Sequence, residues 1–258
     1  MNVKMFKIAM LASLFIIAFG GLVSANDGFN APLGAENATV IRSETSNTSL
    51  YPAAMVPALA GNLTELNITG VSQTKSWQGF FGNVSGTIIL EDSSGMRFYD
   101  WSAAEPQGQV YASVNNTISW TSVGCADIED DTFRGMWYDY YGMLDTDYDN
   151  INITYPYTSH PEFYVGFTTV NGCRTTYTFV DSERQEDPEA ERDFPAVLLT
   201  DENDALIFTS IIEDRAEGAR QGKDGYDGGD YDFQLLVAEN GQFGNSDTTP
   251  YYFWVEIY

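Results

Sequence analysis

Short strand-like segments recur along most of this chain and constrain its fold more than any other feature. They are rich in β-branched and aromatic side chains and are separated by Gly, Asn, Asp and Ser, a pattern typical of strands and turns. We therefore predict a mainly β fold, an antiparallel β-sandwich or a barrel-like sheet, in which the four runs between residues 85 and 120 form a meander. The predicted strands are residues 63–69, 85–90, 96–101, 109–114, 117–120, 152–155, 163–169, 174–180, 196–200, 205–212, 232–238 and 251–258.

One segment, residues 129–144, breaks the strand pattern. Acidic residues at 129–131 suit the positive end of a helix dipole, although Gly135 and Gly142 weaken a helix. We predict one amphipathic helix here, with its aromatic side chains in the core. Its apolar residues recur at the three- and four-residue spacing of a buried helical stripe; they are Phe133, Met136, Trp137, Tyr140, Tyr141 and Leu144.

The chain begins with an export signal. Lys4 and Lys7 precede an apolar run at residues 8–23, and Val23-Ser24-Ala25 supplies the small residues that signal peptidase requires. We predict that residues 1–25 form a cleaved signal peptide; a retained anchor is the alternative, but a run of about 16 residues is short for a bilayer.

The mature chain is predicted to have two parts. Residues 26–60 contain scattered prolines and little periodicity, so we expect a loosely structured N-terminal segment. Residues 61–258 are predicted to form a single β-rich domain, with a subdivision near residue 150 as the alternative.

Seven Asn-x-Ser/Thr sequons follow the signal. Such triplets accept N-linked glycans on exported proteins. We therefore expect an extracellular or cell-surface glycoprotein whose glycans are confined to its N-terminal part. The acceptors are Asn37, Asn47, Asn62, Asn67, Asn83, Asn115 and Asn152.

The chain is strongly acidic, with 37 Asp and Glu against 12 Lys and Arg and a net charge of −25. Such a surface repels nucleic acid and anionic lipid. We expect no nucleic-acid partner, and membrane contact only through the signal segment if it is retained. A high-salt habitat and an ordinary acidic secreted protein would each explain the charge. With 14% aromatic residues, the chain should fold and not remain a disordered acidic tail.

Cys125 and Cys173 are the two cysteines of the chain. In an exported protein we predict that they form one intramolecular disulfide, worth on the order of a few kcal/mol. A metal site is the alternative, but two thiolates and the single His160 do not complete a tetrahedral set without carboxylates. We interpret His160, in Ser-His-Pro, as a turn residue.

Two groups of aspartates are candidate calcium ligands, which makes calcium the one cofactor that the sequence raises. The first group alternates as in the first half of an EF-hand loop, but Asn150 replaces the turn glycine and Pro156 replaces the bidentate Glu. The second lies in a glycine-rich loop that could fold around an ion or form a plain polar hairpin. The groups are Asp145, Asp147 and Asp149, and Asp224, Asp227, Asp230 and Asp232.

No catalytic motif is recognisable. The sequence contains no His-Glu-x-x-His, Gly-x-Ser-x-Gly or phosphate-binding loop, and its single histidine excludes most two-histidine mechanisms. Paired carboxylates for glycoside hydrolysis are available in any chain this acidic, so their presence indicates nothing. We predict that the protein is not an enzyme and name no catalytic residue; a secreted hydrolase is the third functional hypothesis.

A motif at residues 77–86 carries a resemblance. The stretch Trp77-Gln78-Gly79-Phe80-Phe81-Gly82-Asn83-Val84-Ser85-Gly86, with the run at residues 231–237, resembles uncharacterised secreted or cell-surface proteins of archaea. The resemblance extends from about residue 61 to residue 258 and implies no function. Physically, the glycines permit a tight or bulged strand, and the aromatic residues are expected in the core.

Two functional classes fit these features. The favoured one is an exported, N-glycosylated structural or adhesive protein of the cell envelope, whose partners are other copies of itself or other envelope proteins. Its last strand, 251–258, would either add to a neighbour's sheet edge or complete its own sheet. The alternative is a calcium-assisted carbohydrate- or ligand-binding β-sandwich, which burial of its tryptophans would weaken. These are Trp77, Trp101, Trp120 and Trp137.

Overall fold

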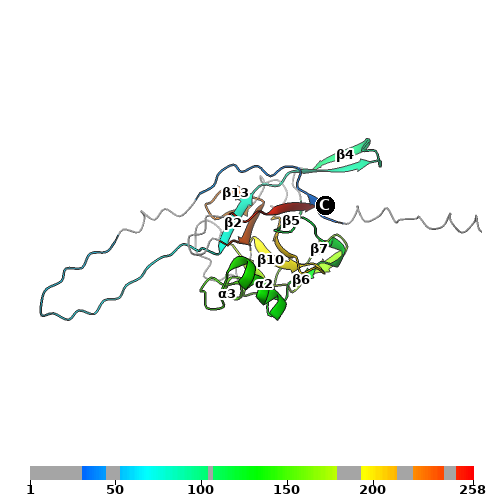
Figure 1. The fold of residues 1–258 in the computed structure, drawn as a ribbon. Helices are drawn as coiled ribbons and strands as arrows, with labels where there is room; N and C mark the ends of the chain where they lie inside the picture. The colour runs from blue at the N-terminus through cyan, green and yellow to red at the C-terminus, as the bar shows by residue number, and fades with distance from the viewer. Residues whose placement is uncertain (1–30, 45–52, 104–106, 179–192, 214–222, 241–247) are drawn as a thin grey trace, which may run out of the picture.

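The structure is a computed structural model that describes residues 31–44, 53–103, 107–178, 193–213, 223–240 and 248–258 (Figure 1). The predicted signal peptide at residues 1–25 and the sequon at Asn47 lie outside these residues, as does the side chain of Asp224. Within the described part, no helix is long and apolar enough to cross a bilayer.

The core of the fold is a seven-stranded antiparallel sheet that gathers strands from both ends of the chain. Its order is β1-β15-β5-β11-β10-β6, and β9 shares the outer edge of β10 with β6. The predicted mainly β, antiparallel fold is confirmed; the described strands are sandwich-like and close no barrel. The bounds are β1 Leu33–Gly34, β5 Gly108–Ser113, β6 Gly124–Cys125, β9 Thr175–Tyr177, β10 Pro195–Thr200, β11 Leu206–Ile211 and β15 Tyr252–Ile257.

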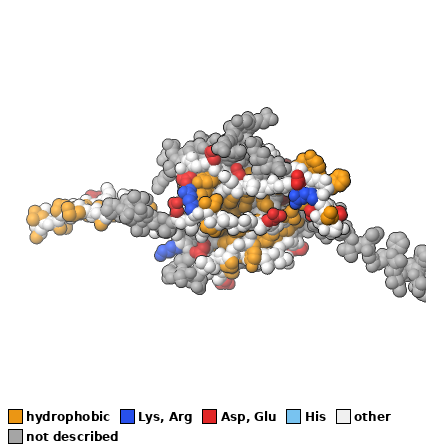
Figure 2. Space-filling model, turned by 90° about the horizontal axis from the view of Figure 1, so that it is seen from above, with side chains coloured by type: hydrophobic (Ala, Val, Ile, Leu, Met, Phe, Trp, Pro, Cys, Tyr) orange, Lys and Arg blue, Asp and Glu red, His pale blue; other side chains and the backbone are white. Residues whose placement is uncertain are grey.

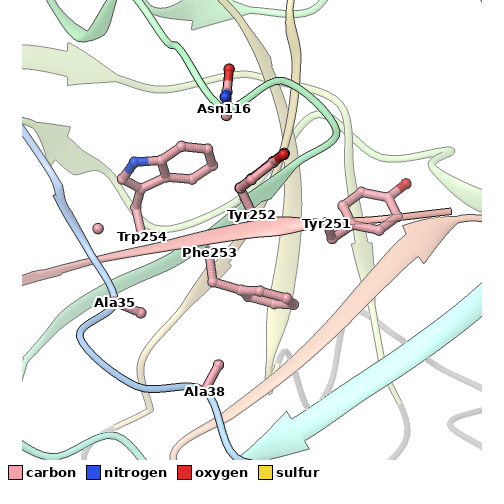
Figure 3. A pocket seen from close by; sticks show the side chains of 8 residues that line it. Ala35, Ala38, Asn116, Tyr251, Tyr252, Phe253 and Trp254 are labelled. Carbon is pink, nitrogen blue, oxygen red and sulfur yellow. The ribbon is translucent and has the colours of Figure 1, made fainter.

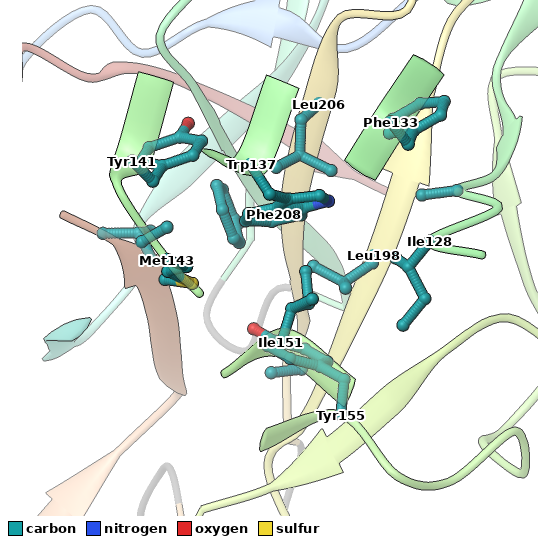
Figure 4. Packing of buried hydrophobic residues seen from close by; sticks show 14 of the residues in the cluster. Ile128, Phe133, Trp137, Tyr141, Met143, Ile151, Tyr155, Leu198, Leu206 and Phe208 are labelled. Atoms are coloured by element: carbon teal, nitrogen blue, oxygen red, sulfur yellow. The ribbon is translucent and has the colours of Figure 1, made fainter. Parts of the chain in front are cut away.

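Both faces of this sheet are covered. Side chains alternate along a strand, so Leu198 and Phe208 lie on one face and Val197 and Ile207 on the other. The first face packs against α2, α3 and β14 (Figure 4), and the second against the β7–β8 hairpin. Burial on both faces explains why β10 is a continuous apolar run. The bounds are α2 Asp131–Tyr141, α3 Ile151–Thr154, β7 Phe163–Val165, β8 Thr168–Val170 and β14 Phe233–Ala238.

The 77–86 motif supplies β2 (Trp77–Gly82), which pairs with β14 along its whole length. This pair forms the second layer of the sandwich. Phe80 packs edge-on against Phe253, with ring centroids 5.2 Å apart, and Trp77 Nε1 donates to the Asp149 carbonyl at 2.6 Å. The motif therefore contributes to the core.

The predicted helix is present but shorter than expected, from Asp131 to Tyr141. Phe133, Trp137 and Tyr141 are buried in the core, as the spacing predicted. Gly142 follows the helix with a φ of 64°, a left-handed conformation that glycine adopts without strain at a helix end.

Three predicted strands are absent, and the predicted meander is wrong. Residues 152–155 lie largely in α3, because the Asn150 side chain caps a helix there by accepting from Ile153 N–H at 3.0 Å. Residues 117–120 lead into a 3₁₀ turn, η2 (Trp120–Ser122), and residues 63–69 form no strand. In place of a meander, β3 and β4 pair with each other, while β5 lies in the central sheet. Their bounds are β3 Gly86–Glu91 and β4 Arg97–Ala103.

Two segments project from opposite ends of the body (Figure 1). One is the β3–β4 hairpin. The other, which we call the arm, is residues 53–75; it contains no helix or strand and turns at Gly61, where Asn62 N–H donates to the Leu59 carbonyl at 3.2 Å. The arm leads into β2, and β2 leads into the hairpin.

Candidate functional site

A tight turn built around Asp92 shapes the β3–β4 hairpin. Asp92 Oδ1 accepts from the Ser94 hydroxyl at 2.6 Å and from the backbone N–H groups of Ser94 and Met96, both at 2.9 Å. These hydrogen bonds, led by that from the Ser94 hydroxyl, lower the pKa of Asp92. Gly95 completes the turn with a φ of 79°. The ionised carboxylate therefore holds the tip in one geometry.

One side of the hairpin is an exposed apolar face. Ile88 lies opposite Trp101, and Leu90 lies opposite Tyr99. Because paired residues point to the same side, these four side chains form one surface, which we call the apolar face. The Tyr99 and Trp101 rings lie 4.7 Å apart, and Trp101 is 51% exposed.

Apolar side chains continue from this face around the tip, where Met96 and Phe98 are exposed. Ile89 lies beside Thr87 on the opposite side of the hairpin and is not part of the apolar face. Monomeric soluble proteins rarely expose a contiguous surface of this kind unless it binds something. The hairpin is therefore the strongest candidate functional site in the described chain.

The root of the hairpin is held firmly on the body. Val84 N–H donates to Asp232 Oδ2 at 2.6 Å, and Asp232 N–H donates to the Gly82 carbonyl at 2.9 Å. Gly86 approaches Ile257 so closely that a Cβ at this position would lie 2.2 Å from Ile257 Cδ1. These contacts fix the direction in which the hairpin projects.

A second surface feature is a shallow depression beside β15 (Figure 3). Tyr252 is 45% exposed there, and Trp254 packs against Trp120 with ring centroids 5.5 Å apart. Its lining side chains offer stacking surfaces and one amide, but no acid–base pair. The depression measures about 360 Å³ and is lined by Gly34, Ala35, Ala38, Asn116, Tyr251, Tyr252, Phe253 and Trp254.

The four tryptophans on which the carbohydrate-binding hypothesis relied differ in exposure. Trp120 and Trp137 are buried and Trp77 is half-buried, whereas Trp101 is exposed on the hairpin. The carbohydrate-binding hypothesis, which stays a prediction, therefore loses two of the four tryptophans on which it depended. The last strand also lies within its own sheet, between β1 and β5, so it is not a free strand for a neighbour.

The aspartates of the EF-hand-like stretch form the turn between α2 and α3. Each carboxylate faces a different protein partner, so the three do not converge on one point. Asp145 pairs with Arg134 at 3.2 Å, Asp147 accepts from Leu144 N–H at 2.7 Å, and Asp149 accepts from the Thr74 hydroxyl at 2.6 Å.

The glycine-rich loop is organised by Arg42. Its guanidinium donates to the Asp227 carboxylate and lies 5.1 Å from the centroid of the Phe81 ring. The Arg42 hydrogen bond lowers the pKa of Asp227. Asp232 faces the hairpin root instead, while Asp224 and Asp230 are backbone partners in β12 (Lys223–Asp224) and β13 (Asp230–Tyr231). The loop thus has the geometry of a polar hairpin.

Among the described residues, no group of three or more His, Cys, Asp or Glu side chains is arranged to hold a metal ion. Calcium binding stays a prediction without structural support. His160 has a structural role: its Nε2 accepts from Cys173 N–H at 3.0 Å and its Nδ1 donates to the Pro161 carbonyl at 2.8 Å. Burial lowers the pKa of this imidazole.

The predicted disulfide between Cys125 and Cys173 is confirmed, with Cα atoms 4.9 Å apart. It joins β6, at the edge of the central sheet, to the segment between β8 and β9. A structural disulfide fits an oxidising compartment.

Most of the described sequons are accessible. Asn152 is half-buried in α3, and Asn47 lies outside the described residues. The other acceptors are therefore open to glycosylation in the folded chain. They are the exposed residues Asn37, Asn62, Asn67, Asn83 and Asn115.

Sequence reasoning missed two features of the site region. The first is the hairpin as an exposed surface, although residues 86–101 signalled it by placing apolar side chains on both sides of predicted strands. The second is Glu256, whose Oε2 accepts from the Tyr111 hydroxyl and whose Oε1 accepts from Gly166 N–H, both at 3.0 Å. Burial raises the pKa of Glu256. The sequence feature that could have indicated Glu256 is that it is the one carboxylate in the aromatic last strand.

Comparisons with protein-family models, with curated proteins and with solved structures return no match for this chain. The resemblance carried by residues 77–86 stays a prediction.

Proposed function

We propose that the protein is an exported structural or adhesive component of the cell envelope, which binds a partner through the β3–β4 hairpin and is not an enzyme. The observation that carries the proposal is the apolar face of Ile88, Leu90, Tyr99 and Trp101, which folding leaves in water. Covering such a surface is favourable by roughly 25 cal/mol per Å² of apolar area.

Location and glycosylation belong to the same proposal. Exposed sequons support N-linked glycans, and the Cys125–Cys173 disulfide supports an oxidising, extracellular or cell-surface location. The acidic composition supports protein or glycan partners over nucleic acid.

Fractionation of the producing cells tests this function. We expect the wild-type chain to remain with the envelope and the Tyr99→Ser/Trp101→Ser chain to be released into the medium. Ile89→Ser is the matched control, because it removes an apolar side chain of the same strand pair from the opposite side; it should stay with the envelope. Equal retention of the double variant and the control would contradict the proposal.

A ligand-binding module is the second candidate, favoured by the depression beside Tyr252 and Trp254. Calorimetric titration with a panel of neutral oligosaccharides, with and without calcium, tests it. Binding that Tyr252→Ala abolishes would support this candidate, and no binding across the panel would remove it.

A further inference from the structure

We propose that the partner of the β3–β4 hairpin is the arm, residues 53–75, of a second copy of this chain, so that copies join head to tail. This inference rests on the proposed function and names the partner that the hairpin binds. Two segments of the same chain whose described apolar side chains are exposed lead to it.

The arm is an apolar segment that lies away from its own body, as Figure 2 shows. A chain that is extended and outside any sheet can add as a strand to a free sheet edge. The hairpin offers such edges, because among the described strands β3 and β4 pair only with each other. The exposed apolar side chains of the arm are Met55, Val56, Leu59, Leu63, Leu66, Ile68 and Val71.

The arrangement of the two segments favours contact between copies. The arm and the hairpin project from opposite ends of the body (Figures 1 and 2), and β2 between them is fixed by its pairing with β14. In this arrangement the arm of each molecule lies away from the hairpin of the same molecule. The part of the arm that runs from its turn back to β2, residues 62–75, is the return limb. It spans at most about 50 Å, a length that can reach a neighbouring molecule. Such a contact between unlike surfaces continues as an open chain unless its rotation closes a ring.

Charge also favours the arm as the segment that approaches another copy. The whole chain carries a net charge of −25, but the arm carries only Glu65 and Lys75 and is neutral. On β4, Arg97 and Asp100 form an exposed ion pair at 3.3 Å, which can exchange partners with those two residues. An anionic lipid surface is a poorer partner, because the acidic body around the hairpin repels it.

The arm's sequons are compatible with this contact. In an extended strand, Asn67 points away from the side that carries Leu66 and Ile68. Asn62 lies at the turn of the arm. Glycans at these two positions therefore leave one apolar side of the limb free.

A mixing experiment with the exported, glycosylated chain tests the inference. One variant disables the arm, Leu66→Ser/Ile68→Ser, which keeps both arm sequons; the other disables the hairpin, Tyr99→Ser/Trp101→Ser. In sedimentation velocity, we expect the wild type to form oligomers that grow with concentration. Each variant alone should need at least a tenfold higher concentration to associate. An equimolar mixture should form heterodimers, because the intact hairpin of one variant binds the intact arm of the other.

The controls separate folding from binding. Ile89→Ser in the hairpin and Thr64→Ser in the arm should assemble like the wild type. Formation of the heterodimer would itself show that both double variants are folded, and circular dichroism checks each one alone.

Three outcomes would overturn the inference. Assembly of the arm variant alone, like the wild type, would mean that hairpin binds hairpin. A wild type that stays monomeric would exclude a second copy as the partner. Fractionation of the hairpin variant would then still test whether the hairpin binds another partner in the envelope. Capture of a monomeric wild type by neutral phosphatidylcholine vesicles would make a membrane the partner.

Discussion

Glu256 is a single carboxylate in the aromatic last strand, and it makes the central sheet sensitive to pH. Burial raises its pKa, so ionisation is less favourable in the folded chain than in the unfolded chain. The penalty is absent at low pH, where both states are protonated. It grows as the pH rises from the ordinary value of 4.5 through the raised, folded pKa.

We expect Glu256→Gln to increase the free energy of unfolding at pH 7 by less than about 1 kcal/mol, because a half-exposed charge is partly screened. Near pH 3 the substitution should have no effect. The amide can still accept from Gly166 N–H and donate to the Tyr111 hydroxyl oxygen. Urea unfolding at the two pH values measures the difference, with the exposed Glu36→Gln as control. An equal gain at both pH values would point to packing and not to ionisation.

At the scale of elements, long patterns with one consistent period were predictable. The strands expected at 109–114, 196–200, 205–212, 232–238 and 251–258 match β5, β10, β11, β14 and β15 to within one residue at each end. The helix was also predictable, because burial of Phe133, Trp137 and Tyr141 needs the helical spacing that the sequence shows.

The remaining elements depended on contacts that no local pattern contains. Residues 63–69 alternate like a strand but pair with none of the strands that the structure describes. Asn150 overrides the β-branched residues that follow it by capping a helix. The role of the glycine-rich loop also depended on a distant contact. The partner of Asp227 is Arg42, 185 residues away, so the aspartate that suggested an ion ligand binds an arginine of the same chain.

The disulfide links β6, at the edge of the central sheet, covalently to the segment between β8 and β9. Removing it should lower the free energy of unfolding of the whole fold. Cys125 and Cys173 are separated by 48 residues, a loop whose closure entropy corresponds to roughly 4 kcal/mol. We expect the Cys125→Ala/Cys173→Ala chain to lose about that much free energy of unfolding in denaturant titrations. Reduction of the wild type should give a similar loss, and a loss below about 1 kcal/mol would show that the unfolded chain is not restricted by this loop.

At the scale of the whole molecule, the net charge of −25 opposes any association between copies. Salt screens this repulsion, since the Debye length falls from about 10 Å at 0.1 M to about 3 Å at 1 M. We therefore expect the concentration for half-assembly to fall by about tenfold or more between 0.1 M and 1 M NaCl, as measured by light scattering.

The hairpin variant Tyr99→Ser/Trp101→Ser should stay dispersed at both salt concentrations. Calcium chloride at matched ionic strength distinguishes screening from specific ion binding. If the wild type instead dissociated as salt increased, ion pairs and not apolar burial would hold the copies together.

The arm, β2 and the hairpin follow one another directly in the chain. In a head-to-tail assembly, a pulling force would enter through the arm, pass along the covalent backbone of β2, and leave through the hairpin. The central sheet, its helices and the Cys125–Cys173 bond would then lie outside the part of the chain that carries the force. Because β2 is already an extended strand, this path has almost no slack to release, so such a fibre would be stiff while each folded body stayed intact.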